Sequence, residues 1–266
     1  MCLVTLTLHL LKPVSELSNI LQSFAPISLK EMDGVELMNR TDTKFMTSMS
    51  VLISILKTLP DSYRVLEVNG LRQSGYETLY YDTPDFLFYR RHHSGKKNRY
   101  KIRKRSYVES NLNFLEVKFK SNKDRTIKDR TKLPSIEEFL IDTEKDFIEG
   151  ETHLGLELVP KLWNSFKRIT LVNQDLPERL TIDCDLSFKY GETETQMKGL
   201  VICEVKQEKQ NRRSPFMQEV KRRMIRAESI SKYCLGVALL YPDTKSNNFK
   251  SKLLKIKKIE NDGIAA

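Results

Sequence analysis

Charged residues alternate with apolar ones between Arg99 and Lys120, a stretch that reads as two strands joined by a polar turn. One face carries Arg99, Lys101, Arg103 and Arg105 on the first strand and Glu116, Lys118 and Lys120 on the second. Leu115, Val117 and Phe119 fall on the opposite face, because side chains alternate along a strand. Arginine and lysine bind phosphate oxygens, and carboxylates hold divalent metal, so this face suits a phosphate-rich anion.

The same alternation recurs in four other segments, each predicted as a strand with a polar face. These faces carry Arg40, Asp42 and Lys44; Asn164, Phe166, Arg168 and Thr170; Arg179, Thr181, Asp183 and Asp185; and Glu204 and Lys206. One such strand is ordinarily half exposed to water, but a sandwich of many would bury unpaired charge. Seven or eight antiparallel strands closed into a barrel around a wet tunnel avoid that cost. We therefore expect an α+β fold with charged faces inward and apolar faces under helices.

The positive charge is confined to one part of the chain. The protein has 266 residues and a formal net charge of +10, with a pI near 9.3. Residues 90–130 hold 15 Lys or Arg and 4 Asp or Glu, a net of +11, against −1 for the rest. Such a segment indicates an anionic partner or substrate. The chain has no GxxxxGK or GxGxxG run, so P-loop and dinucleotide-binding chemistry are unsupported.

The cysteines and the hydropathy indicate a cytoplasmic, soluble protein. Cys2, Cys184, Cys203 and Cys234 have no CxxC spacing, and three of them fall at apolar positions, which is typical of free buried thiols in a reducing compartment. No stretch approaches the roughly 20 apolar residues that span a bilayer.

Helices are expected outside the charged strands, within a single domain over residues 1–266. They cover Pro13 to Phe24, a segment capped by Ser48 or Ser50, a segment from Ser135, a segment capped by Ser214, and a C-terminal amphipathic stretch around Leu253. SNKDRTIKDR is predicted as an exposed loop, and His92 and His93 as surface residues of an aromatic strand. SISKYCLGVALLY is predicted to lead into a last apolar strand, with Ser231 and Lys232 at its junction.

Eight runs, in order from about Leu37 to Tyr241, resemble a known family. They are RTDTKF, TLYYDTPDFLFY, KIRKR, FLEVKFK, SFKR, ERLTID, CEVK and SKYCLGVAL. The resemblance is to the catalytic domain of vacuolar transporter chaperone (VTC) polyphosphate polymerases, within the triphosphate tunnel metalloenzyme (CYTH-like) superfamily. It implies an eight-stranded antiparallel tunnel barrel with helices packed outside. It also implies a phosphotransferase that moves the γ-phosphoryl of ATP onto polyphosphate and releases ADP, with Mn²⁺ or Mg²⁺.

The resemblance also implies which residues act. The implied catalytic, phosphate-binding set is Lys44, Arg103, Arg105, Lys118, Arg168, Arg179, Lys206 and Lys232. Glu204 is the implied metal ligand and Glu116 a second candidate. Arg40, Lys128, Arg130 and Ser231 are further candidates for phosphate contact, and Phe166 stands where the family pattern has tyrosine.

Three other functions remain open on the sequence alone. A tunnel triphosphatase would hydrolyse triphosphate, and hydrolytic superfamily members carry an E-x-E-x-K strand where this chain has Arg40, Asp42 and Lys44. That difference favours the polymerase. A non-catalytic polyphosphate or nucleotide-binding module would bind without turnover. A nucleic-acid-binding domain fits least well, because its basic residues would lie on an outward surface rather than alternate with apolar ones.

Overall fold

The computed structural model describes residues 16–32, 40–122 and 126–264. The expected N-terminal helix is helical over residues 16–22, and its predicted start at Pro13 lies outside the described residues. Cys2 also lies outside them.

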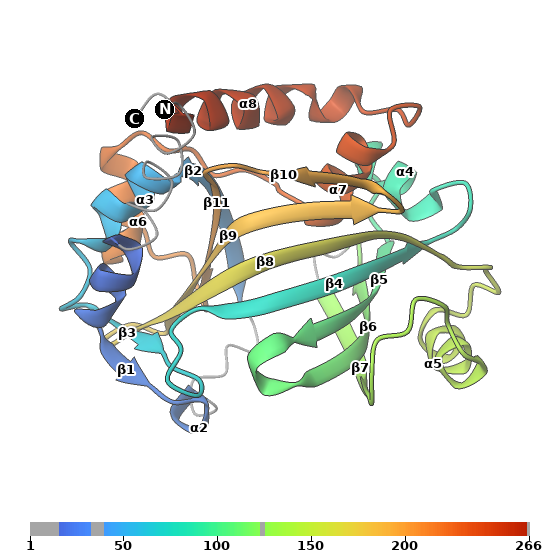
Figure 1. Ribbon diagram of the computed structural model, residues 1–266, viewed down its shortest axis with the longest axis horizontal. Coiled ribbons are helices and arrows are strands. Elements are labelled where there is room, and N and C mark those ends of the chain that lie inside the picture. The colour runs from blue at the N-terminus through green and yellow to red at the C-terminus, as the bar shows by residue number, and fades with distance from the viewer. Residues whose placement is uncertain (1–15, 33–39, 123–125, 265–266) are drawn as a thin grey trace, which may run out of the picture.

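One curved antiparallel sheet dominates the fold (Figure 1). Its main strands follow the order β2 (Thr41–Ser48), β11 (Leu200–Gln207), β9 (Glu178–Tyr190), β8 (Val159–Asn173), β4 (Ser74–Asp82), β5 (Arg99–Tyr107), β6 (Leu112–Lys120) and β7 (Thr126–Leu133). Short strands β1 (Ala25–Ile27) and β3 (Tyr63–Leu66) extend it beside β8, and β10 (Thr193–Gln196) pairs with β9. The expected closed barrel is wrong, because β2 and β7 end the strand order without pairing to each other.

The curvature still turns the charged faces toward one another. The charge of Glu204 on β11 acts on Lys118 on β6 and raises its pKa, although four strands lie between β6 and β11 in the sheet order. The charge of Lys44 on β2 likewise lowers the pKa of Lys101 on β5. The inner face is therefore the concave one, as expected from the alternation of charge.

Helices cover the outer face in two places. The helix at residues 16–22, α3 (Met49–Leu56) and α6 (Pro215–Arg222) pack on apolar side chains of β2, β9 and β11. The predicted caps form, since the hydroxyls of Ser48 and Ser214 accept from the backbone N–H groups of Val51 and Met217. Helix α5 (Asp142–Thr152) covers β5 and β6, where Ile148 packs near Leu115 and Val117.

A third group of helices closes one end of the inner face. Helices α4 (Leu87–His93), α7 (Lys232–Leu240) and α8 (Lys250–Ile264) pack on inner-facing apolar side chains of β2, β8, β9 and β11. The closest approach is at Gly236 of α7, where an added Cβ would lie 2.7 Å from Phe188 and 2.9 Å from Leu162. Short α2 (Leu29–Met32), η1 (Val108–Ser110) and η2 (Asn247–Phe249) complete the fold. In the described residues, no helix is long and apolar enough to cross a membrane.

Four predicted elements are wrong in type or extent. SISKYCLGVALLY forms helix α7, capped by Ser231, because its apolar residues pack on helices as well as strands. His92 and His93 belong to helix α4, which begins where Asp82 accepts the N–H groups of Phe88 and Tyr89. The predicted loop after Ser121 contains β7, which pairs with β6 along its length. The helix expected from Ser135 begins only at Asp142.

A β-bulge at Asp185 changes which residues of β9 face inward. The pairing of β8 with β9 gains one residue on β9 between Cys184 and Ser187, and Asp185 has a φ of 52°. Asp183 therefore faces inward, but Asp185 is exposed and pairs with Lys167 at 3.4 Å. Beyond the bulge, Leu186 and Phe188 join the inner apolar cluster. The predicted split of β9 into one polar and one apolar face holds only up to Cys184.

Candidate functional site

Three carboxylates lie on the inner face with at most 17% of each side chain exposed, and each is bound by two or more cations. We call this polar part of the inner face the trough. It comprises the side chains of Lys44, Lys101, Arg103, Arg105, Glu116, Lys118, Lys128, Arg168, Asp183, Glu204, Lys206 and Lys232.

The Glu116 cluster is supplied by the central hairpin and β7. Register sets Glu116 directly opposite Arg103, whose Nε donates to Oε2 at 2.7 Å. Lys128 Nζ lies 2.5 Å from Oε1, and Arg105 Nη1 lies 4.0 Å from Oε2. The Glu116 side chain is only 1% exposed. Burial raises the pKa of this carboxyl, but the three cations outweigh burial and lower it below its ordinary value.

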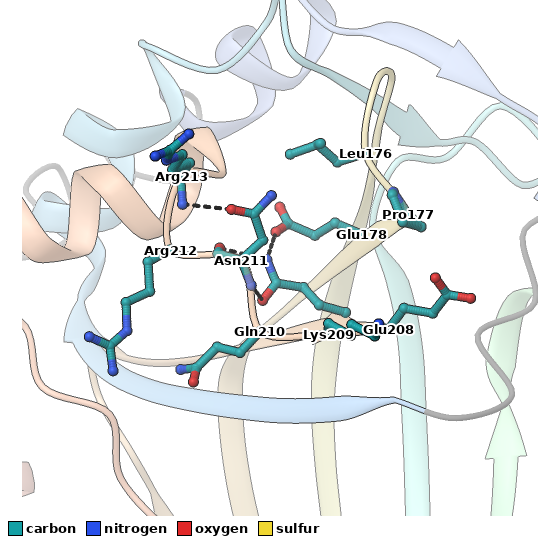
Figure 2. A pocket seen from close by; sticks show the side chains of 10 residues that line it. Leu176, Pro177, Glu178, Glu208, Lys209, Gln210, Asn211, Arg212 and Arg213 are labelled. Carbon is teal, nitrogen blue, oxygen red and sulfur yellow. Dashed lines mark hydrogen bonds between the residues drawn. The ribbon is translucent and has the colours of Figure 1, made fainter.

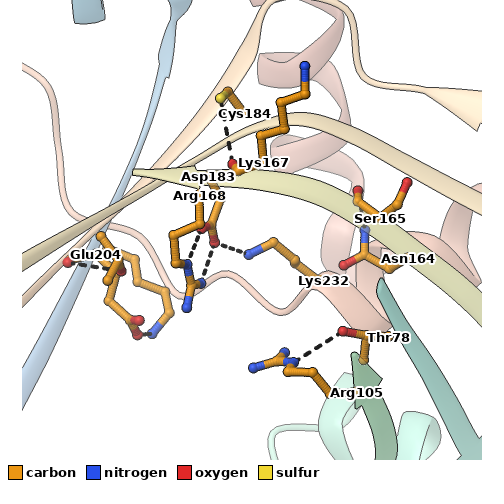
Figure 3. Close-up of polar contacts among 12 residues, drawn as sticks. Thr78, Arg105, Asn164, Ser165, Lys167, Arg168, Asp183, Cys184, Glu204 and Lys232 are labelled. Carbon is orange, nitrogen blue, oxygen red and sulfur yellow. Dashed lines mark hydrogen bonds and ion pairs between the residues drawn. The ribbon is translucent and has the colours of Figure 1, made fainter. Parts of the chain in front are cut away.

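The Asp183 cluster joins two strands to α7 (Figure 3). Arg168 lies opposite Asp183 in the register and donates through Nε at 2.5 Å and Nη2 at 2.8 Å, a bidentate pair. Lys232, the first residue of α7, donates to the same carboxylate. Burial raises the pKa of Asp183, but Arg168 and Lys232 lower it further than burial raises it. The cluster therefore stays ionised and fixes α7 to the sheet.

The Glu204 cluster is supplied by β2 and β11, at the other end of the strand order from the Glu116 cluster. Glu204 is directly opposite Lys44 on β2 and forms an ion pair with it and with Lys206. Lys206 Nζ also donates to Thr181 Oγ1 at 3.1 Å. Burial raises the pKa of Glu204, but Lys206 and Lys44 hold it well below the ordinary value. The same burial lowers the pKa of Lys206.

Two lysines in the trough have no carboxylate partner among the described residues. Lys101 and Lys118 lie directly opposite each other on β5 and β6. Lys101 Nζ donates to Ser231 Oγ at 3.0 Å. Burial, together with the charges of Arg103 and Lys44, lowers the pKa of both to about 8, and the charge of Lys101 lowers that of Lys118 further. Two opposed ammonium groups without a counter-ion form a place for an anion.

An aromatic pair supports two of the cations. Tyr76 and Phe166 stack with ring centroids 5.1 Å apart and an interplanar angle of 14°. Arg168 lies over the Tyr76 ring at 4.8 Å and Lys232 over the Phe166 ring at 4.3 Å. Arg105 Nε donates to Thr78 Oγ1 at 3.2 Å, two residues along β4 from Tyr76 (Figure 3).

Sequence reasoning assigned no role to Tyr76, Lys101 or Asp183. Lys101 and Asp183 do lie on faces that the alternation had identified. Tyr76 lies two residues before the run TLYYDTPDFLFY, and its alternation with Thr78 and Tyr80 was the available signal. The stack itself requires the register between β4 and β8, in which Tyr76 pairs with Phe166.

The remaining candidates lie at the margins of the trough. Arg40 precedes β2 and pairs with Asp42 at 3.1 Å, where both are partly exposed. Arg179 lies on β9 opposite Lys206. Arg130 lies opposite Glu116 in the register, but its guanidinium covers the Phe114 ring at 4.6 Å. Ser231 caps α7 and accepts from Lys101.

A cavity of about 520 Å³ opens beyond the ends of β9 and β11 and is separate from the three clusters (Figure 2). Its centre holds a carboxylate, Glu178, which accepts from Tyr63 and Gln207. Gln207 in turn binds both backbone groups of Asn211, which orders the turn after β11. A cavity built around a satisfied carboxylate is unsuited to a phosphate chain, so the trough remains the candidate site.

The three described cysteines are free and buried, as predicted. Burial raises the pKa of each thiol, so none is a nucleophile at neutral pH.

Comparison with known proteins identifies the family and supports the fold. The VTC domain family model matches residues 39–241. A putative adenylate cyclase from Bacillus halodurans is 13% identical with a TM-score of 0.50, over 77% of this chain and 100% of that one, and it supports the fold. A putative adenylyl cyclase from Hippeastrum, described as having a dominant triphosphatase activity, is 14% identical with a TM-score of 0.46, over 78% of this chain and 100% of that one. No curated protein matches the chain. The expected resemblance is confirmed: the chain belongs to the VTC domain family.

Proposed function

We propose that this protein is a metal-dependent polyphosphate polymerase that transfers the γ-phosphoryl group of ATP to a growing polyphosphate chain. The observation that carries the proposal is the trough, in which cations outnumber the carboxylates that hold them, within a chain of the VTC domain family. An arginine paired with one carboxylate through two N–H groups keeps further donors for a phosphate. The carboxylates thus fix the cations in place without using all of their hydrogen-bonding capacity.

The proposed reaction needs position and charge rather than a side-chain nucleophile. A terminal oxygen of the polyphosphate chain forms a bond to the γ-phosphorus of ATP, the bond to the β–γ bridging oxygen breaks, and ADP leaves. Charge spreads over the oxygens of the transferred group in the transition state. Arg168, Arg103 and Lys206 come from three different strands of the trough and would hold those oxygens in line.

The proposed metal site consists of single carboxylates. No group of three or more His, Cys, Asp or Glu side chains that could hold a metal occurs in the described part of the chain. Mg²⁺ is commonly bound through one or two carboxylates plus substrate phosphates, so Glu204, or less directly Glu116, fits as the single protein ligand. Mn²⁺ or Mg²⁺ bound there would neutralise charge on neighbouring phosphates. Lys44 and Lys206 would then be released to phosphate oxygens.

The proposed partners are ATP and polyphosphate, in the cytoplasm and without nucleic acid. The second candidate function is a tunnel triphosphatase, in which water replaces the polyphosphate oxygen as acceptor. A third is a binding module without turnover. All three use the trough, so the products distinguish them.

The experiment incubates the purified protein with ATP and Mn²⁺ or Mg²⁺ and resolves ADP, free phosphate and polyphosphate together. We expect polyphosphate to appear with ADP, and Glu204→Gln to abolish its formation. Lys167→Gln is the control, because Lys167 is on the outer side of β8 beside Arg168 and, among the described residues, forms an ion pair only with exposed Asp185. Free phosphate without polymer would replace the proposal with the triphosphatase, and the absence of turnover would replace it with the binding module.

A further inference from the structure

A second cavity, of about 190 Å³, lies behind the N-terminus of α7. Its lining includes His92 of α4, Arg99 of β5, Ser231 and Cys234 at the start of α7, and Asn248 and Lys252 near the start of α8. None of the three carboxylates of the trough lines it. At about 30 Å³ per molecule it has room for roughly six waters, and hence for a small oxyanion with part of its hydration.

The cavity is positive and has no described carboxylate in contact with its cations. Arg99 donates to the backbone carbonyl of Lys96, and Lys252 lies over the ring of Phe249 at 5.7 Å. Lys101 borders the cavity through its hydrogen bond to Ser231. Within the described residues, none of these three cations forms an ion pair with a carboxylate, in contrast to the cations of the three clusters.

His92 lines the cavity and carries an unused polar group. Its Nδ1 atom is buried and has no hydrogen-bond partner among the described residues. Burial and the charges of Lys101, Arg99 and Lys252 lower the pKa of His92 to about 2, so the ring is neutral at physiological pH. A neutral imidazole carries one N–H and can donate it to an anion. An orphaned polar atom in a positive cavity indicates a missing partner.

We propose that this cavity binds a single phosphate-sized oxyanion, for which inorganic phosphate is the simplest ligand. The Nδ1–H group of His92 would donate to it, and Arg99 and Lys252 would balance its charge. The first turn of α7 contributes a favourable dipole on the same side. The proposal goes beyond the proposed function, since it requires no turnover in the trough. Ser231 lines the cavity and also accepts a hydrogen bond from Lys101. An anion bound in the cavity would therefore act on the position of Lys101 in the trough.

The test is a phosphate titration followed by nuclear magnetic resonance of the histidine rings. The chain has four histidines, and the His92 signal is the one that disappears in His92→Asn. We expect phosphate to shift this signal saturably in the wild-type protein and equally in Arg168→Gln, which disables the trough. Lys252→Gln should weaken the apparent affinity by about tenfold. The matched control is Lys257→Gln, which is exposed on the same helix and does not line the cavity.

Four results would overturn the proposal. The first is a His92 signal that phosphate does not move. The second is an equal response of Lys252→Gln and Lys257→Gln. The third is loss of the shift in Arg168→Gln, which would place the phosphate in the trough. The last is a shift caused by adenosine but not by phosphate, which would make this a nucleoside pocket. A failed turnover assay would leave these readouts unchanged, so the two proposals fail separately.

Discussion

The two ends of the inner face are built on the same strands and differ in what covers them. On β11, Ile202 belongs to the apolar end and Glu204 to the trough, two residues apart on one face. On β2, Met46 and Lys44 show the same change. Helices α7 and α8 exclude water from the apolar end, whereas the trough holds paired charges. Whether one face of a strand is polar or apolar along its length therefore depends on the element that packs on it.

The bulge at Asp185 is the point where the two ends meet on β9. Before it, inward positions carry Thr181 and Asp183, and after it they carry Leu186 and Phe188. Lys232 then connects the ends, because it begins the helix that closes the apolar end and binds the carboxylate that begins the trough.

The largest effect on this comparison is expected from Asp183→Ala. Removing a buried carboxylate leaves Arg168 and Lys232 without their partner, which costs about 3 kcal/mol of unfolding free energy. Asp185→Asn, two residues along the strand, keeps a residue type that tolerates the positive φ, removes the charge of an exposed pair with Lys167 and should cost under about 1 kcal/mol. Urea denaturation of both variants measures the difference. Equal losses would show that the trough's ion pairs do not hold α7 on the sheet.

A smaller effect is expected at the apolar end from Gly236→Ala. The new Cβ would clash with Phe188 and Leu162, and overpacking of this kind costs about 1–3 kcal/mol. Gly150→Ala is the control, because no atom outside the glycine's own helical turn lies within 4 Å of the added Cβ, and alanine favours a helix. Thermal unfolding should fall for the first variant and rise slightly for the second. An unchanged Gly236→Ala would mean that α7 is not seated closely on β8 and β9.

The smallest expected effect is a pH dependence of triphosphate affinity and of stability, caused by two lysines of the trough. Lys101 and Lys118 have pKa values lowered to about 8, so they lose charge as pH rises above 8. Triphosphate affinity should then fall by up to about tenfold per pH unit for each lysine that must be charged. Stability should change in the opposite direction, because between pH 8 and the ordinary lysine pKa the unfolded chain binds more protons. Calorimetry and denaturation across this range check both signs, and parallel trends would refute the assignment.

The sequence was sufficient to predict which residues share a strand face. It was insufficient to predict which element packs on that face. Strict alternation predicted β2, β5, β6 and β11, and the caps at Ser48 and Ser214 were correct. Apolar runs such as SISKYCLGVALLY were wrong because a buried helix and a buried strand have similar composition. Barrel closure was wrong because it depends on whether two edge strands far apart in sequence pair, which alternation does not encode.

For the site, the sequence identified the residue types and the strand faces on which they lie. The ion-pair partner of each residue became known only from the register between neighbouring strands. Arg168 and Glu204 were both named as candidates, yet nothing in their local sequence indicates that Asp183 and Lys44 lie opposite them. The bulge at Asp185 was also hidden, since no glycine marks it.

The central claim is that the trough, and not the basic charge of the chain as a whole, binds triphosphate. Calorimetric titration with inorganic tripolyphosphate of Arg168→Gln and Lys167→Gln tests it directly, because these neighbours carry the same charge on opposite faces of β8. We predict an affinity loss of at least about tenfold for Arg168→Gln, as expected for hydrogen bonds to a charged group, and less than about twofold for Lys167→Gln. Equal losses in the two variants would contradict the account.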